Sequence, residues 1–459
     1  MRVPATNLFS TPSFKRGVSR GLPMILVLAG IWIISHSPVR ASDLALNLKE
    51  AVEWALSGEG SSDVQMAQEL IREVEARSGQ SRAELLPHLE ASIGQQEQTR
   101  NLEALGLRSS LNFRPPTLVG PFSTFDARAR LTQSIFNLSS TRRFQASRSA
   151  VLVAKSEQEN IQEQVASQVA RSYLEALRNR ARLDAARANL DLAVALADLA
   201  ESQRASGTGT RIEVTRAQVQ LSNEQQVALA AEHAYQQSLL RLLKMIGLPL
   251  DVNLTLTESL SYVRVEIASL SEAMAIALRS RPDLRARQER EQHATLNYRA
   301  AQSERFPSLT GFAGYGTIGS SISNTIPTWD LGISLQLPLF DGGSFDARRA
   351  ESSSKLRQER IEMQDLRRQI ELEVRLALAG LRLAEEQIKV AEEGLQLAQQ
   401  ELDQGRRRYQ SGITTNIEVT DAQARLARAK ENHITALFNF NFERVNLAEA
   451  MGTIRSMIQ

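Results

Sequence analysis

One sixteen-residue segment occurs twice in this chain. Residues 206–221 read SGTGTRIEVTRAQVQL and residues 411–426 read SGITTNIEVTDAQARL, with ten identical positions. Each copy lies inside a stretch of more than 100 residues without proline, which is typical of long helices. Gly207 and Gly412 suit the left-handed residue that follows a helix end. The segment therefore predicts the same turn between two long helices in each half of the chain.

The sequence also predicts where the next helix begins after each glycine. Thr210 and Glu213 have the spacing of a capping box, and Thr415 and Glu418 repeat it. The threonine hydroxyl and the glutamate carboxylate then bond backbone amides at the start of the next helix. Each segment is therefore expected to form the tip of a helical hairpin.

The first 41 residues have the features of a secretory signal peptide. Basic residues precede the apolar stretch 22–34, and Val39-Arg40-Ala41 supplies small residues for cleavage after Ala41. The alternative is an uncleaved membrane anchor. The full chain has 459 residues. Once this segment is removed, 49 basic and 52 acidic residues remain, a net charge of −3. Because that charge is slightly negative, nucleic-acid binding is not expected. With no cysteine, disulfides and thiolate metal sites are excluded.

Two equivalent halves follow, predicted as repeat 1 at 42–250 and repeat 2 at 269–459, joined by a linker at 251–268. The pattern Leu48-x-Glu50-Ala51 recurs 222 residues later and begins an amphipathic helix each time. Pro87 and Pro307 end these helices and lead into extended segments. The linker is polar, with two short alternating stretches that predict minor strands.

Strands and long helices are then predicted in the same order in both halves. Apolar residues alternate over 125–132 and 329–337, and partner strands are expected at about 86–97 and 308–318. The loops between them are expected at the turn formers Pro115, Pro116, Gly120 and Pro121, and at Gly319 and Pro327. Helices are expected over about 140–205 and 345–410, each roughly 100 Å long, and both return after the tip to about 246 and 451.

The predicted fold class is α+β, mainly α: a long α-helical coiled-coil barrel joined to a small antiparallel transmembrane β-barrel. Four strands cannot close a barrel, and an open edge in lipid leaves backbone groups unpaired. Two chains would give eight strands around a filled interior, whereas three would give twelve around a lumen. A homotrimer embedded in outer-membrane lipid is therefore expected, with two internal repeats in each chain.

The whole chain after the signal resembles the TolC-like outer-membrane efflux family, the outer membrane factors of tripartite pumps. The resemblance rests on the two tips, on the strand entries LLPHL and RFPSL, and on the QLPLFDGG segment at 336–343. It implies a trimeric channel-tunnel in the cell outer membrane with a periplasmic extension. It also implies a periplasmic adaptor and an inner-membrane transporter as partners, and no cofactor.

The resemblance further implies that the tips dock the adaptor and close the tunnel. The residues it assigns to adaptor docking are Gly207, Thr210, Ile212, Glu213, Gly412, Thr415, Ile417 and Glu418. The residues it assigns to the periplasmic gate are Tyr409, Glu213, Glu418 and Asp421. For the two glutamates, helix capping alone is the alternative.

Two positions depart from symmetry or from the family pattern. Asp421 has no acidic counterpart in the first half, where Arg216 stands. In some relatives an arginine two residues after the second tip glycine holds the channel closed. The residue at that position in this chain is Thr414. A lock of that kind is therefore not expected, unless Arg211, Arg407 or Arg408 replaces it.

No enzyme is expected, because the sequence contains no constellation of nucleophile, base and orienting residue. The five histidines are scattered without metal-ligand spacing. Two other functions remain open: the outer-membrane component of type I protein secretion, and a periplasmic coiled-coil adaptor protein without a pore. The exported substrate cannot be read from the barrel or the tube.

Overall fold

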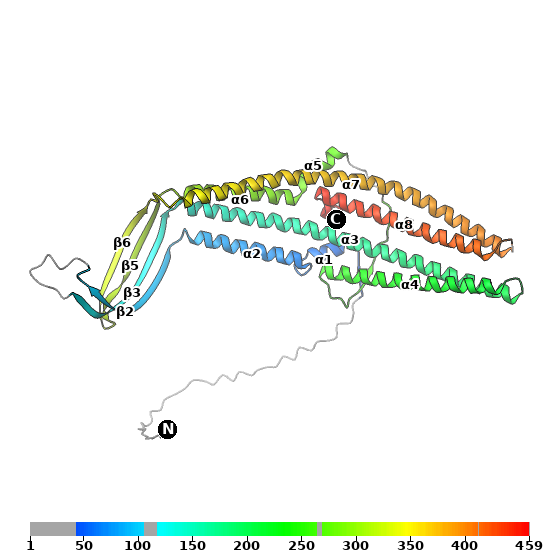
Figure 1. The fold of residues 1–459 in the computed structure, drawn as a ribbon, viewed down its shortest axis with the longest axis horizontal. Helices are drawn as coiled ribbons and strands as arrows, with labels where there is room; N and C mark the ends of the chain where they lie inside the picture. The colour runs from blue at the N-terminus through cyan, green and yellow to red at the C-terminus, as the bar shows by residue number, and fades with distance from the viewer. Residues whose placement is uncertain (1–42, 105–116, 264–268, 412, 459) are drawn as a thin grey trace, which may run out of the picture. The chain divides into compact units, whose positions relative to one another are not determined.

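The structure is a computed structural model that describes residues 43–104, 117–263, 269–411 and 413–458. The predicted signal peptide and the tip residue Gly412 lie outside the described residues. Figure 1 shows a β-sheet at one end of a set of long helices and the ends of the helical hairpins at the other. Among the described residues, no helix has both the length and the apolarity needed to cross a membrane.

Each half places a pair of short helices before its strands. These are α1 (Leu48–Leu56) and α2 (Ser62–Ala83) in the first half, and α5 (Leu270–Ser280) and α6 (Pro282–Ser303) in the second. One continuous helix was predicted in each place, and that is wrong in both. In the second half the break occurs at Arg281, which precedes Pro282, because a residue before proline is held out of the helical conformation.

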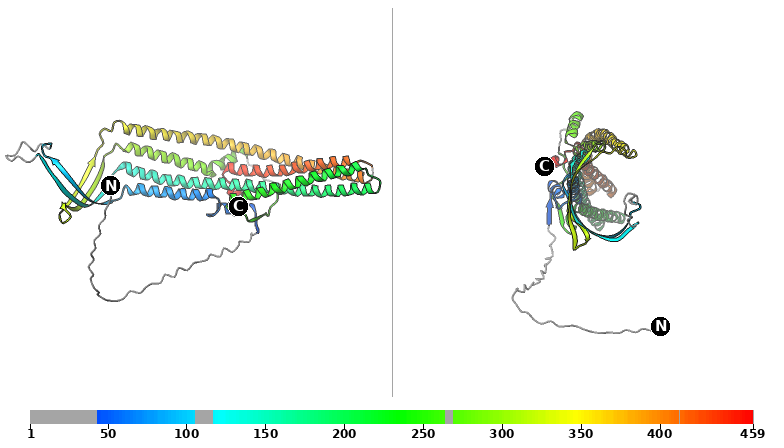
Figure 2. Two further views of the ribbon diagram at one scale, coloured as in Figure 1. Left: turned by 60° about the horizontal axis from the view of Figure 1, so that its bottom comes forward. Right: turned by 90° about the vertical axis from the view of Figure 1, so that its left-hand side faces the viewer.

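The four strands form one antiparallel sheet with the order β2-β3-β5-β6. Their bounds are β2 (His88–Asn101), β3 (Leu118–Phe136), β5 (Ser308–Ser321) and β6 (Asn324–Gln336). The strands are curved, as the end view in Figure 2 shows. The predicted strands are confirmed. In this order β2 and β6 are the edge strands, and no further strand of the described chain pairs with them.

The two faces of the sheet differ in polarity. On one face Leu89 lies opposite Leu131, and Tyr315 lies opposite Trp329, with all four side chains exposed. The other face is polar: Arg130 of β3 reaches across β5 to Asp330 of β6, with 3.5 Å between nitrogen and oxygen. The sheet is therefore amphipathic across its whole width, and the described residues leave its apolar face uncovered.

Of the turn formers predicted for the loops, Pro115 and Pro116 lie outside the described residues, and the others lie within strands. Gly120 and Pro121 lie in β3, at the register shift between Gln98 and Arg100 of β2, and Gly319 lies in β5. Pro327 lies in β6, which is an edge strand. Proline lacks an N–H donor, so a strand accepts it at an irregularity or on an edge, and both positions satisfy that condition.

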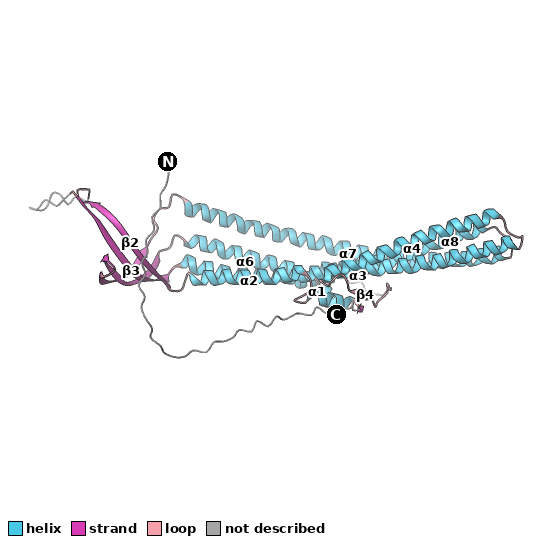
Figure 3. Ribbon diagram, turned by 90° about the horizontal axis from the view of Figure 1, so that it is seen from below, coloured by secondary structure: helices cyan, strands magenta, loops and turns pink. Residues whose placement is uncertain are grey.

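Two long helices connect the sheet to the tips. They are α3 (Leu138–Ala205) and α7 (Ser344–Gln410), and each is followed by a returning helix, α4 (Arg211–Ile246) or α8 (Asn416–Met451). These bounds confirm the predicted helices to within a few residues. Figure 3 shows that α2 and α6 accompany the long helices on the side of the sheet, whereas α4 and α8 accompany them on the side of the tips. Thus α3 packs against both sets and also against α8 of the other half.

A small sheet in the middle of the helices was only half predicted. Strand β4 (Asn253–Leu256) lies in the linker as expected, and pairs in parallel with β1 (Asp43–Leu46), which was not predicted. The side chains of Leu46 and Leu254 are buried in the main hydrophobic cluster together with Tyr173 of α3. The hydroxyl of Tyr173 donates to the carbonyl of Leu46 at 3.1 Å, so the sheet is tied to the long helix. A short helix, α9 (Ile454–Ile458), was also missed.

Two glycines with the same backbone conformation provide a test of this packing. Gly247 after α4 has φ +80°, and a Cβ there would lie 2.4 Å from the carbonyl oxygen of Gly60. Gly207 at the tip has φ +78°, with no atom within 4 Å of such a Cβ. We expect Gly207→Ala to cost roughly 1–2 kcal/mol of backbone strain, and Gly247→Ala to cost more, because the backbone at Gly60 cannot move aside easily.

The measurement is the thermal unfolding of the two purified variants beside the wild type. Gly207→Ala is the matched control, since both variants place alanine in a left-handed conformation. Equal losses of melting temperature would show that the contact with Gly60 is not close-packed.

Candidate docking site at the helix tips

The first tip is a tight turn around one carbonyl group. After α3 the amides of Thr208 and Gly209 both donate to the carbonyl oxygen of Gln203, each at 2.9 Å. The left-handed Gly207 lets the chain turn back there, as the sequence predicted. The carbonyl groups at the end of α3 thus find donors within the turn, and the tip is a defined structure rather than an open loop.

The start of α4 is capped as predicted. The carboxylate of Glu213 accepts from the amide of Thr210 at 2.8 Å and from its hydroxyl at 2.9 Å. The bond from the Thr210 amide is the glutamate half of a capping box, and a capped helix start of this kind contributes about 1 kcal/mol. Glu213 therefore has a complete structural role within its own chain.

The second tip is capped differently, and the predicted capping box of Thr415 and Glu418 is wrong. The side chain of Thr415 makes no capping bond. Glu418 instead accepts from the hydroxyl of Thr414 and forms an ion pair with Arg408 at 3.3 Å.

The repeat explains this difference. Shifted by 205 residues, Arg408 corresponds to Gln203 and Thr414 corresponds to Gly209. The first tip therefore has neither the positive charge nor the hydroxyl that draws Glu418 away from its own helix start. Of the three arginines that could replace a lock, Arg408 is the one that contacts a tip glutamate, and it does so within its own chain.

A groove runs between the first turns of α4 and α8. It has a volume of about 290 Å³, and its two walls are formed by equivalent positions of the repeat. The pairs are Ile212 with Ile417, Thr215 with Thr420, and Arg216 with Asp421. The two isoleucine side chains are at least half exposed. The groove therefore joins an apolar strip to one positive and one negative side chain.

The structure thus brings together some of the predicted site residues and separates others. Ile212, Ile417 and Asp421 lie in the groove, whereas Thr210, Glu213, Thr415 and Glu418 line the turns beside it. The groove also includes Val219, Thr215 and Thr420, which were not predicted. Their signal was present, because Thr215 and Thr420 occupy the same place in the two copies of the repeat.

Tyr409 lies apart from the groove in the last turn of α7. Only 5% of its surface is exposed, and it packs in a cluster with Val419, Ala422 and Leu426 of α8. Its hydroxyl has no hydrogen-bond partner in the described part of the chain. Burial raises the pKa of Tyr409, and the negative charge of Glu213 raises it further. The hydroxyl therefore stays protonated.

A metal centre is not formed by the described part of the chain. Across residues 43–104, 117–263, 269–411 and 413–458, no group of three or more histidine or acidic side chains is arranged to hold a metal ion.

Two helical hairpins joined to an amphipathic four-stranded sheet also form the fold of two outer membrane channels of known structure. The CmeC outer membrane channel of Campylobacter jejuni has this fold, with a TM-score of 0.75 and 16% sequence identity over 88% of this chain and 85% of that one. The open MtrE channel of Neisseria gonorrhoeae has it too, with a TM-score of 0.73 and 18% identity over 91% and 93%.

The chain belongs to the outer membrane efflux protein family, whose sequence model matches residues 56–248 and 274–453. Its place is accordingly the outer membrane, with the helices extending into the periplasm. The two matched segments cover the two halves of the chain, each with its strands and its hairpin.

Two curated relatives from Pseudomonas putida are similar in sequence. The toluene efflux pump outer membrane protein TtgF is 24% identical over 456 residues, which cover 95% of this chain and 91% of that protein. The pyoverdine export outer membrane protein OpmQ is 25% identical over 296 residues, 62% of this chain. The match spans 61% of the length of OpmQ.

Proposed function

We propose that this protein is the outer-membrane exit duct of an efflux pump, a passive conduit that a periplasmic adaptor connects to an inner-membrane transporter. The relatives support export of small molecules, since TtgF is a toluene efflux pump protein and OpmQ a pyoverdine export protein by name. Type I protein secretion is the alternative with the same architecture. An adaptor without a pore would leave the amphipathic sheet unexplained.

The observation that carries this proposal is the sheet with an apolar face and two edges that no strand of the described chain pairs. In lipid, strand edges must be paired, so β2 of one copy has to meet β6 of another. Three copies give twelve strands and leave a lumen, whereas the eight strands of two copies would enclose only side chains. In such a homotrimer the polar face with Arg130 and Asp330 would line the lumen, and the face with Trp329 would meet lipid.

Cysteine crosslinking tests the edge pairing against a clean background, because the natural chain has no cysteine. We place cysteine at Ser92 in β2 and, in separate variants, at Gly332, Ser334 or Gln336 in β6, all on the polar face. At least one pair is expected to join chains into a disulfide-linked trimer in outer-membrane fractions. The matched control pairs Ser92 with Thr310 of β5, an inner strand that no neighbouring chain should reach. Crosslinked species that stop at dimers would contradict the trimer.

We further propose that the tip groove receives the periplasmic adaptor. Exposed Ile212, Val219 and Ile417 offer an apolar strip, and Arg216 and Asp421 offer charges of both signs at its rim. A partner helix with apolar residues at helical spacing and charges beside them suits such a groove. The turn at Gly207 and the described residues of the second tip would then position the groove rather than supply most of the contact.

A charged substitution in the groove should therefore abolish docking. We expect Ile417→Asp to reduce crosslinking to the adaptor by roughly tenfold or more, because burying an unpaired carboxylate is costly. Val227→Asp is the matched control: Val227 is 52% exposed, similar to the 50% of Ile417, but lies outside the groove. The trimer should persist in both variants. Retained adaptor crosslinking in Ile417→Asp would place the docking surface elsewhere.

We propose that the gate also lies at the helix tips. In a trimer, three copies of Asp421 would form an acidic ring that favours cations. Glu213 and Glu418 are already engaged within their own chains, so their contribution would be to hold the tip in shape. Tyr409 is buried against α8 of its own chain, so its contribution would be to hold α7 and α8 together beside the gate.

Planar-bilayer recordings test the acidic ring. Asp421→Asn is expected to lower the permeability ratio of cations to anions by roughly twofold, since it removes three charges from one level of the pore. Asp403→Asn in α7 is the control with the same change of charge away from the groove. If both variants keep the selectivity of the wild type, Asp421 does not belong to the gate.

A further inference from the structure

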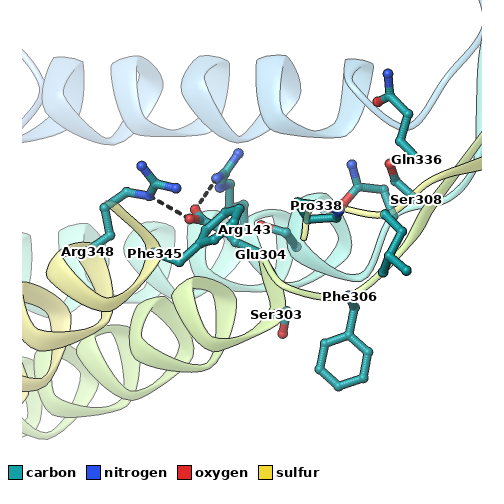
Figure 4. A pocket seen from close by; sticks show the side chains of 12 residues that line it. Arg143, Ser303, Glu304, Phe306, Ser308, Gln336, Pro338, Phe345 and Arg348 are labelled. Atoms are coloured by element: carbon teal, nitrogen blue, oxygen red, sulfur yellow. Dashed lines mark hydrogen bonds and ion pairs between the residues drawn. The ribbon is translucent and has the colours of Figure 1, made fainter. Parts of the chain in front are cut away.

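A cavity of about 760 Å³ lies where the sheet meets the helices, far from the tips in the chain. The start of β5, the end of β6, the end of α6 and the starts of α3 and α7 surround it, so both halves contribute to its wall. Figure 4 shows Arg143 of α3 and Arg348 of α7 pointing toward Glu304 at the end of α6. The size is within the range of sites for small organic ligands.

The cavity wall carries an excess of positive charge. Glu304 is bonded by Arg143 at 2.5 Å and by Arg348 at 2.6 Å, and its side chain is only 11% exposed. Arg348 is further held by Ser344, by Asp341 at 3.7 Å and by the ring of Phe345 at 5.0 Å. For Arg143, Glu304 is the one partner found in the described chain, so most of its five N–H donors remain available.

A second observation points to a missing ligand. Ser139, in the first turn of α3, also lines the cavity and is 7% exposed. Its hydroxyl has no hydrogen-bond partner in the described residues. Buried hydroxyl groups are normally bonded, and an orphan in a cavity wall indicates a bound molecule or a water that satisfies it.

Apolar side chains complete the wall. Leu337 and Pro338 follow the end of β6, and the ring of Phe345 lies beside Glu304 in Figure 4. The wall thus combines the positive charge of Arg143 and the unbonded hydroxyl of Ser139 with several apolar side chains. That pairing fits a molecule with an acidic headgroup and an apolar body.

We propose that this cavity binds an amphiphilic organic anion, with Arg143 and Ser139 holding its phosphate or carboxylate and Leu337 and Phe345 contacting its apolar part. Two sources could supply such a molecule: an exported compound in the duct, or a phospholipid. Ser308 and Gln336 border the cavity and pair with one another on the sheet face that carries Asp330. This face is opposite to the exposed apolar one, so the geometry favours the duct.

The choice between the two sources rests on the proposed outer-membrane channel, but the site itself does not. Binding is measured on the purified full-length protein and needs no transport. Failure of the strand-edge crosslink would thus leave this proposal standing, and the reverse also holds.

The probe is dodecyl phosphate in dodecyl maltoside micelles. Inorganic phosphate, which is its headgroup alone, and dodecanol, which is its apolar body alone, are tested beside it. A nitroxide on a cysteine at Gln336 should broaden the phosphorus resonance of dodecyl phosphate, whereas the same label at Thr208 should not. Arg143→Gln is expected to weaken binding by roughly tenfold and Ser139→Ala by about threefold, while either fragment alone binds weakly.

Arg305→Gln is the matched control, because Arg305 pairs with Asp346 at 2.6 Å at the same junction and lies outside the cavity wall. It should bind like the wild type. The proposed site would be contradicted if the phosphorus resonance is not broadened, or if it is broadened equally in all folded variants. Should Arg143→Gln fail to fold, Ser139→Ala decides alone. Retention of phosphatidylglycerol through purification, and its displacement of the probe, would identify the lipid as the source; displacement only by added anions would identify the duct.

Discussion

The structure depends on one constraint, the pairing of backbone groups at the edges of the sheet. Within the described chain, strands β2 and β6 each present an unpaired edge, and nothing covers the apolar face between them. The apolar face is stable against lipid, but the two open edges are not stable in a lone copy placed there, because unpaired amide and carbonyl groups cost several kcal/mol. The order of the strands therefore supports the proposed assembly of several copies, whatever the helices contribute.

The helices extend that requirement along the whole chain. Each long helix begins shortly after a strand ends, so the direction of β3 and β6 sets the course of α3 and α7. Asn137 and Asp341 make these transitions, since their side chains bond the first amides of the two helices. Arg143 and Arg348 then join the helices through Glu304. The junction between sheet and helices is consequently one of the places where the two halves are bound to each other, in addition to the packing of α3 against α6 and α8.

Most of this architecture could be predicted from the sequence, because it rests on long periodic segments and on a repeat that states each signal twice. Apart from the helix break before Pro282, which the sequence itself signals, the misses were short or depended on distant partners. Strand β1 has four residues and forms only through β4, more than 200 residues away. The capping of Glu418 followed from Arg408 and Thr414, which compete with Thr415 for the same carboxylate. The burial of Tyr409 was likewise set by α8 packing, which no local pattern reveals.

The differences between the two tips carry more information than their likeness. Identical positions such as Ile212 and Ile417 preserve the turn and the apolar strip, whereas Arg216 and Asp421 put opposite charges on equivalent places. In the proposed trimer six tips would alternate between two kinds, one held by a capping box and the other by an ion pair with Arg408. An exposed ion pair weakens with salt far more than a capping bond does. The second kind of tip is therefore the one whose stability a change in its surroundings can alter, and it is the half of the chain that carries Tyr409 and Asp421.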